Sequence, residues 1–156
     1  MTRHRPPSNH SRQSGVSLLE VLIAVVVLSF GLLGLAGLQL TSLRNNQSAL
    51  ERSNAVMLTY TIVEAMHADR AATRNNDFNI AMGAAAPGGG TFAGQSLATW
   101  LVELQNALGP AASGSVACAA VAAATDSTNC TITVQWDDSR GLGGNAAQTI
   151  VTEVRL

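Results

Sequence analysis

The first third of the chain is dominated by one long apolar run. Between Val21 and Leu38 the only polar residue is Ser29. Counted from Val16, the run is about 23 residues long, and an α-helix of that length spans roughly 34 Å. A helix of this length crosses the hydrocarbon core of a bilayer. The pattern therefore predicts a transmembrane helix.

A helical pattern continues past the membrane run, with no break signal before Asn75. Leucine and methionine recur at every seventh position, and neighbouring apolar residues widen this stripe. We expect one helix over about residues 16–73, whose second half packs on a soluble head through the stripe. The stripe comprises Leu43, Leu50, Met57, Leu58, Ile62, Ala65 and Met66, and it is interrupted by Glu51 and Asn54.

A second helix is predicted after a Gly/Ala-rich loop over residues 82–96. Ser96 is the expected N-cap, and Gly109-Pro110 is the expected end. Trp100 lies beside the apolar stripe and is expected to anchor packing. The stripe consists of Leu97, Leu101, Leu104 and Leu108.

Strand patterns fill the C-terminal third. Residues 131–136 and 149–156 alternate apolar and polar positions, and residues 116–121 do so more weakly. The Gly-rich link between the last two strands suits a loose hairpin. We expect an α+β fold, in which a small antiparallel sheet of three or four strands lies against the long N-terminal helix.

The charge distribution sets the orientation of the membrane helix. The chain has 156 residues and a net charge of −1, so composition gives no case for nucleic-acid binding. Arg3, Arg5 and Arg12 precede the apolar run, and Arg44 is the first basic residue after it. The positive-inside rule then leaves the N-terminus in the cytoplasm and exports the chain beyond about Leu40. A cleaved secretory signal and a plain signal anchor are the alternatives.

Two cysteines, Cys118 and Cys130, lie near the C-terminus. In an exported chain such a pair favours a disulfide. Two free buried thiols and a metal site are the alternatives. His4, His10 and His67 all lie in the N-terminal half, away from the cysteines, and His67 is expected to be a surface or packing residue.

Neither a cleaved secretory signal nor a plain signal anchor explains Glu20, a carboxylate at the start of the apolar run. A charged side chain deep in a membrane span costs roughly 2.5–3.5 kcal/mol on insertion scales. An intramembrane carboxylate is therefore a functional hypothesis that needs a partner.

The stretch Gly15-Val16-Ser17-Leu18-Leu19-Glu20 resembles the class III signal of type IV pilins and type II secretion pseudopilins. The resemblance implies a type IV pilin-like fold and a basic leader that a prepilin peptidase removes between Gly15 and Val16. It implies that the same enzyme methylates Val16. Glu20 is then the fifth residue of the mature chain.

The resemblance also supplies a partner for Glu20. The freed α-amine of Val16 is mostly protonated at neutral pH, so Glu20 of one subunit can pair with this amine on a neighbour. Gly31, Gly34 and Gly37 interrupt the apolar run. They are expected to permit close helix packing or local melting of the helix in a filament. A phosphate-binding role is excluded because these glycines lie within an apolar helix.

The segment SALERSNAVMLTYTIVEAMHADRAA and the later TVQWDDSR resemble PilV-type minor pilins. This resemblance implies a precursor in the bacterial inner membrane and a mature subunit in the periplasm or the cell-surface pilus. The implied partners are other minor pilins, the major pilin and the inner-membrane assembly machinery. The expected organisation is a leader over residues 1–15, a transmembrane and polymerisation helix over 16–40, the soluble half of the helix over 41–75, and an α+β head over 76–156.

A non-catalytic role as a minor pilin in type IV pilus assembly is the leading functional hypothesis, because the sequence shows no catalytic constellation, cofactor motif or metal-ligand cluster. The nearest rival is a minor pseudopilin of type II secretion. An adhesin or DNA-uptake subunit is a third reading, for which Arg140 is the candidate cation, although Asp137 and Asp138 lie close to it. A membrane-anchored periplasmic enzyme ranks last.

Overall fold

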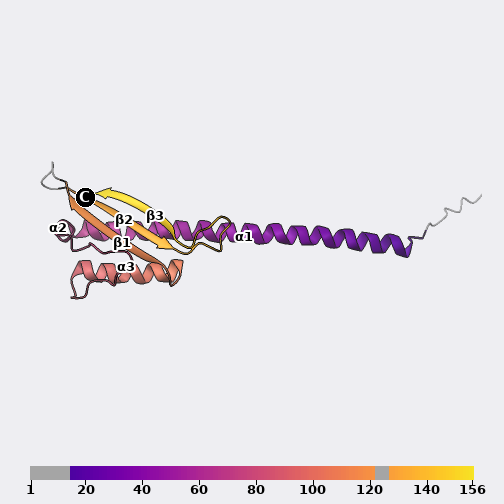
Figure 1. Ribbon diagram of the computed structural model, residues 1–156, viewed down its shortest axis with the longest axis horizontal. Coiled ribbons are helices and arrows are strands. Elements are labelled where there is room, and N and C mark those ends of the chain that lie inside the picture. Colours follow the sequence, from indigo (N-terminus) through magenta and orange to yellow (C-terminus); the bar gives the residue numbers. More distant parts are fainter. Residues whose placement is uncertain (1–14, 122–126) are drawn as a thin grey trace, which may run out of the picture. The chain divides into compact units, whose positions relative to one another are not determined.

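A computed structural model describes residues 15–121 and 127–156. The chain divides into two compact units, one ending at Leu40 and the other comprising Thr41–Leu156. Figure 1 shows the elements in chain order. These are the helices α1 (Leu18–Ala68), α2 (Arg70–Arg74) and α3 (Phe92–Leu108), and the strands β1 (Ser113–Ala120), β2 (Thr128–Trp136) and β3 (Gln148–Arg155).

The described part of the first unit consists of residues 15–17 and the N-terminal part of α1. This part is helical without a break from Leu18 to Leu40, and its side chains are exposed throughout. It is long and apolar enough to cross a membrane. Its apolar residues therefore gain nothing from packing within the unit, which fits a segment whose natural surroundings are lipid or other helices.

The second unit is built around an antiparallel sheet with the strand order β1-β2-β3. The central strand β2 alternates strictly, and its buried face consists of Thr128, Cys130, Ile132, Val134 and Trp136. This face and α3 enclose a core that includes Phe78, Leu97 and Leu104. The expected α+β fold with a small antiparallel sheet is confirmed.

The predicted apolar stripe on the second half of α1 is only partly confirmed: Ile62 and Met66 are buried, and Leu58 and Ala65 pack against the core. Leu43, Leu50 and Met57 are 65, 61 and 58 % exposed. Small side chains at the buried positions let neighbouring elements approach the helix closely, and the Thr59 hydroxyl donates to the Ala55 carbonyl at 2.8 Å, so its burial costs little. The buried face consists of Glu51, Ala55, Thr59, Ile62, Val63 and Met66.

The long helix is also shorter than expected, because it ends at Ala68 and not near residue 73. Asp69 has φ −128° and ψ 76°, outside the helical region, and its side chain accepts from the Ala72 amide at 2.9 Å. Asp69 is thus the N-cap of the short α2. Thr73 then folds back and donates to the Met66 carbonyl at 2.9 Å.

Helix α3 begins earlier than predicted. Its N-cap is Thr91, whose hydroxyl accepts from the Gly94 amide at 3.1 Å, and Ser96 lies inside the helix. The predicted end is confirmed, since Gly109 terminates the helix at φ 102°. Trp100 is a packing anchor as expected. It is 1 % exposed, and its indole Nε1 donates to the Leu58 carbonyl of α1 at 2.9 Å.

Candidate assembly site

The start of α1 carries the residues singled out as a processing and assembly site. Gly15 and Val16 precede the helix, have no regular secondary structure and are exposed. Ser17 is the N-cap, because its hydroxyl accepts from the Glu20 amide at 3.2 Å and its carbonyl from the same amide at 3.0 Å. The helix therefore begins two residues later than the predicted start at Val16.

Ser17 and Glu20 have the Ser-x-x-Glu spacing of a capping box. The structure shows the half of this box in which Ser17 caps the Glu20 amide. Glu20 also places a negative charge in the first turn of the helix, where the helix dipole favours it. The spacing of Ser17 thus gives Glu20 a local role that the sequence reading missed.

The Glu20 side chain is exposed. Among residues 15–121 and 127–156, no salt bridge is formed by its carboxylate. The structure thus places Gly15 and Val16 just before the apolar helix and Glu20 in its first turn. The carboxylate remains available to a cation from outside the chain.

The three glycines of the apolar run do not form a cluster with these residues. Gly31, Gly34 and Gly37 lie within continuous helix, and a Cβ added at any of them would meet no atom within 4 Å. Ser29 donates its hydroxyl to the Val25 carbonyl at 2.7 Å, so the one polar side chain of the run is satisfied inside the helix. Close packing or melting at the glycines stays a prediction.

In the head, the expected disulfide joins Cys118 of β1 to Cys130 of β2. The two residues lie directly opposite each other in the sheet register. The bond therefore links two strands that are already paired in the sheet. Loop closure of this length stabilises the folded state by about 3 kcal/mol in the chain-entropy account.

A polar cluster fixes the loop between β2 and β3 to α1. Asp138 is 2 % exposed, accepts a hydrogen bond from the Ser48 hydroxyl at 2.7 Å and lies 3.7 Å from the Arg52 guanidinium. Arg140 lies 3.8 Å from the Glu51 carboxylate. We call these five residues the loop clasp.

Glycines make the loop clasp geometrically feasible. A Cβ at Gly144 would collide with the Asp138 carbonyl, and one at Gly141 would lie 2.8 Å from the Asp138 carboxylate and 3.1 Å from Ser48. The Gly141 amide donates to the Asp138 carbonyl at 2.9 Å. The Gly-rich link is therefore a compact turn shaped around Asp138.

The loop clasp changes the interpretation of Arg140. The sequence suggested an isolated cation in an exposed loop, whereas the structure pairs it with Glu51 of α1. Asp137 is also engaged. A hydrogen bond from Ser139 holds the pKa of this exposed carboxyl below its ordinary value of 3.8, with a smaller contribution from the Arg140 charge. The loop thus offers two carboxylates and one already paired cation, which disfavours phosphate binding.

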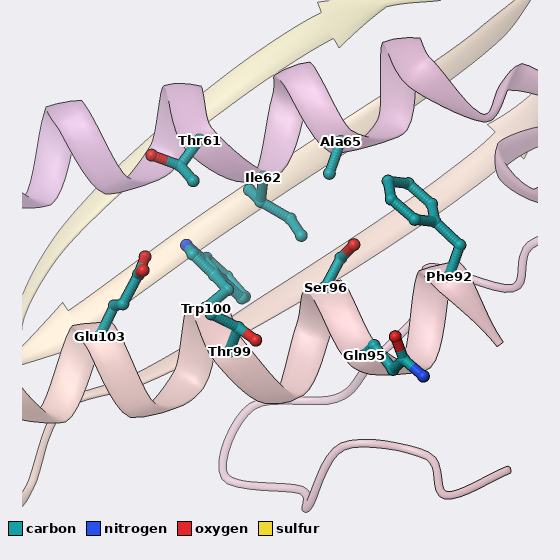
Figure 2. A pocket seen from close by; sticks show the side chains of 9 residues that line it. All are labelled: Thr61, Ile62, Ala65, Phe92, Gln95, Ser96, Thr99, Trp100 and Glu103. Atoms are coloured by element: carbon teal, nitrogen blue, oxygen red, sulfur yellow. The ribbon is translucent and has the colours of Figure 1, made fainter. Parts of the chain in front are cut away.

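A groove lies between α1 and α3, and Figure 2 shows the side chains that line it. Ile62 and Ala65 of α1 face Trp100 and the half-exposed Phe92 of α3, with hydroxyl and amide groups at the margins. The groove contains one ionisable side chain, Glu103. It has no pair of titratable groups that could act as acid and base.

Metal binding has no support in the described parts of the chain. No group of three histidine, cysteine, aspartate or glutamate side chains there could hold a metal ion. Both cysteines are used in the disulfide, which removes the metal alternative for them.

The loop clasp and the face of α1 are the features that sequence reasoning missed. Glu51 looked like an interruption of an apolar stripe, but it lies on the buried face and meets Arg140. The sequence does contain a usable signal. Ser48, Glu51 and Arg52 are polar residues on one stretch of α1, and the acidic and Gly-rich link after β2 supplies groups that can bind to them.

Comparison with known families supports the N-terminal part of this interpretation. Residues 10–36 match a family described as "Prokaryotic N-terminal methylation motif". The matched range includes Gly15, Val16, Glu20 and most of the apolar run. It supports a pilin- or pseudopilin-type protein with a membrane-anchored precursor, and it implies processing by a prepilin peptidase. Comparisons with curated proteins and with solved structures gave no match.

Proposed function

We propose that this chain is a minor pilin of the PilV type that takes part in the assembly or priming of a type IV pilus. Its role is structural and non-catalytic, and it supports pilus-dependent functions such as twitching motility and adhesion. The precursor resides in the bacterial inner membrane with a cytoplasmic N-terminus. The mature subunit passes to the periplasm and the cell-surface pilus.

Assembly depends on the first turn of α1. Cleavage after Gly15 creates an α-amine on Val16, and methylation keeps this amine basic. The amine lies next to the positive end of the helix dipole, so it gains from an anionic neighbour. Glu20 of an adjacent subunit supplies that anion, and in an apolar setting the pair fixes the register between the two helices.

One observation carries the proposal. Glu20 is an exposed carboxylate, one turn into a helix of membrane length, inside a segment that matches the methylation motif. The helix dipole favours a negative charge here but does not give the carboxylate a cationic partner, which a neighbouring subunit would supply. Other minor pilins, the major pilin and the inner-membrane assembly machinery are the partners this role requires.

Mass spectrometry of the mature N-terminus tests the processing step. We expect a chain that begins at N-methylated Val16. A chain that retains Met1, or one that begins near Leu38, would contradict the proposal.

A second experiment tests the role of Glu20 and separates a pilus from a secretion system. In a strain whose own copy is deleted, Glu20→Gln should be processed but should not restore surface pili or twitching. Glu64→Gln is the matched control, because Glu64 is an exposed carboxylate on the same helix. Loss of exoprotein release with intact pili would instead assign the chain to type II secretion.

A further inference from the structure

The two edges of the sheet differ in a way that the assembly site does not explain. At the β1 edge, Val116 exchanges both backbone hydrogen bonds with Ile80, at 2.9 and 3.0 Å. Next to it, the Asn79 side-chain amide accepts from the Cys118 amide at 2.8 Å and donates to the Cys118 carbonyl at 3.3 Å. Residues 79 and 80 therefore occupy the bonding positions of Val116 and Cys118, in the middle of β1, that an added strand would need.

The β3 edge has no such cover. Thr128 and Leu156 exchange backbone hydrogen bonds at 2.8 and 2.9 Å. Bonded and non-bonded pairs alternate in an antiparallel ladder. Because Thr128 and Leu156 form a bonded pair, every second residue of β3 counted back from Leu156 also bonds to β2, and these are the even-numbered residues. The odd-numbered residues direct their N–H and C=O groups away from β2. Within the described residues, no further backbone bond involves Thr149, Val151, Glu153 or Arg155.

Strand β3 has only part of the protection that is usual for an edge. It has no proline, and all eight residues keep an uninterrupted register with β2, so there is no bulge. Natural edge strands are usually shortened, bulged, covered, interrupted by proline or given charged side chains, and in β3 the charges are limited to Glu153 and Arg155. A long regular edge is therefore open beside one that is covered at Val116 and Cys118.

The side chains of β3 define what can pair with it. On the core side, Ile150 and Val154 pack on the core but remain partly exposed, so an apolar margin borders the edge. On the outer side, Val151 is 58 % exposed, and it is followed by the charges of Glu153 and Arg155.

We propose that β3 is an acceptor edge, to which an extended segment of a partner protein adds as an antiparallel fourth strand. Only an extended segment presents N–H and C=O groups at the spacing of this edge. Its core-side residues are apolar, to cover the margin at Ile150 and Val154. Its outer face carries a cation opposite Glu153, because opposite charges across a strand pair attract. This surface goes beyond the proposed function, since it rests on the sheet and not on the helix start.

A binding assay with full-length protein in detergent tests the proposal. The probe is a synthetic peptide that repeats residues 128–136 with Cys130→Ser, because β2 already pairs with β3 in this alternating pattern. A second peptide has Thr131→Lys, and a third is N-methylated at the amides that would face β3. We expect saturable binding of the first, tighter binding of the second and loss of binding by the third.

Substitutions in β3 supply the complementary test. Val151→Pro removes an outward amide without removing a bond to β2, so the strand should remain folded and peptide binding should weaken at least about tenfold. Val151→Ala is the matched control, because it removes side-chain atoms but keeps the amide. Circular dichroism checks the fold of both variants. If Val151→Pro does not fold, the N-methylated peptide still decides the question on the unaltered chain.

Several results would overturn the proposal. These are undetectable binding of the first peptide, equal binding of the N-methylated peptide, and equal binding to the Val151→Pro variant. If the chain instead forms a dimer that Val151→Pro abolishes, and the peptide does not bind, then the segment that pairs with β3 belongs to a second copy of this chain and not to a partner protein. Glu20→Gln should leave peptide binding unchanged, and Val151→Pro should leave Val16 methylation unchanged, so failure here is distinct from failure of the minor-pilin role.

Discussion

The two halves of α1 obey different rules although they form one helix. From Leu18 to Leu40 the side chains are apolar on nearly all sides and exposed. From Thr41 to Ala68 one face is buried, and it includes a glutamate and a threonine together with apolar residues. Hydrophobic content alone therefore does not identify the face of a helix that packs within its own chain.

The two halves of α1 are stabilised by different kinds of contact. The second half is held by intramolecular contacts, such as the hydrogen bond from Trp100 to Leu58 and the loop clasp at Ser48, Glu51 and Arg52. The first half has no comparable contacts within its unit, so its apolar surface depends on a membrane or on other subunits. Substitutions should therefore affect folding in one half and assembly in the other.

The largest effect on folding is expected at Trp100. Trp100→Ala leaves a cavity and removes the bond to the Leu58 carbonyl, which together should cost about 3–5 kcal/mol of unfolding free energy. Phe30→Ala, in the first half of α1, should change the same quantity by less than about 0.5 kcal/mol because Phe30 is 71 % exposed. Denaturant unfolding of the full chain in detergent measures the free energy of unfolding of both variants. Equal losses would refute the conclusion that only the second half of α1 contributes to folding within the chain.

Removal of the disulfide should have the next largest effect. The double variant Cys118→Ser/Cys130→Ser should lose about 3 kcal/mol, because the unfolded chain regains the entropy of the open loop. A reducing agent should lower the melting temperature of the natural chain but not that of the variant. An unchanged melting temperature on reduction would show that the bond contributes nothing to the head.

A smaller loss is expected from the loop clasp. Asp138→Asn weakens the attraction to Arg52 and disturbs the bond from Ser48, which should cost about 1–3 kcal/mol for a buried group. Asp137→Asn makes the same chemical change at a neighbour that is only partly buried and should be nearly neutral. If the two variants unfold alike, Asp138 does not fix the loop to the helix.

Substitution of the outward face of α1 should have little effect on folding. Leu50 is 61 % exposed, so Leu50→Gln should change the unfolding free energy by less than about 0.5 kcal/mol. The sequence stripe would have placed Leu50 in the core, where the same change would cost several times more. Denaturant unfolding thus distinguishes the two faces directly.

The smallest effect concerns acid titration of Asp137. Its folded pKa should lie below 3.8, and Ser139→Ala should move it upward, because the hydrogen bond from Ser139 is the main cause of the shift. Because the pKa of Asp137 is lower in the folded than in the unfolded chain, its ionised carboxylate stabilises the fold at pH values above the unfolded pKa. This contribution is lost as the pH falls through the folded pKa. Carbon-detected NMR titration measures the shift, and an unchanged pKa in Ser139→Ala would refute its cause.

Local patterns predicted much of this architecture. The membrane-length helix, the end of α3 at Gly109, the strand over residues 131–136 and the cysteine pair all depend on nearby residues or simple spacing. Such features are encoded in short stretches of sequence, so one chain is enough to read them. The motif that contains Gly15, Val16 and Glu20, the residues proposed for processing and assembly, was recognisable for the same reason, since they lie within six positions.

The errors arose where distant parts of the chain decide the outcome. Glu51 is buried because Arg140, far along the sequence, lies against it. The helix ends at Ala68 because Asp69 caps a new helix and Thr73 folds back on Met66. No periodicity of α1 encodes these tertiary contacts, so Glu51 was interpreted as an interruption of the apolar stripe although it lies on the buried face.

The side-chain amide of Asn79 has a consequence for the number of neighbours that the head can join through its sheet. With residues 79 and 80 bonded to the middle of one edge, a strand can pair along its full length with the other edge only, so association by full strand addition stops after a single event. A head with both edges open would have a valency of two and could grow into chains of sheets. One amide thereby helps to distinguish a terminating unit from an aggregating one.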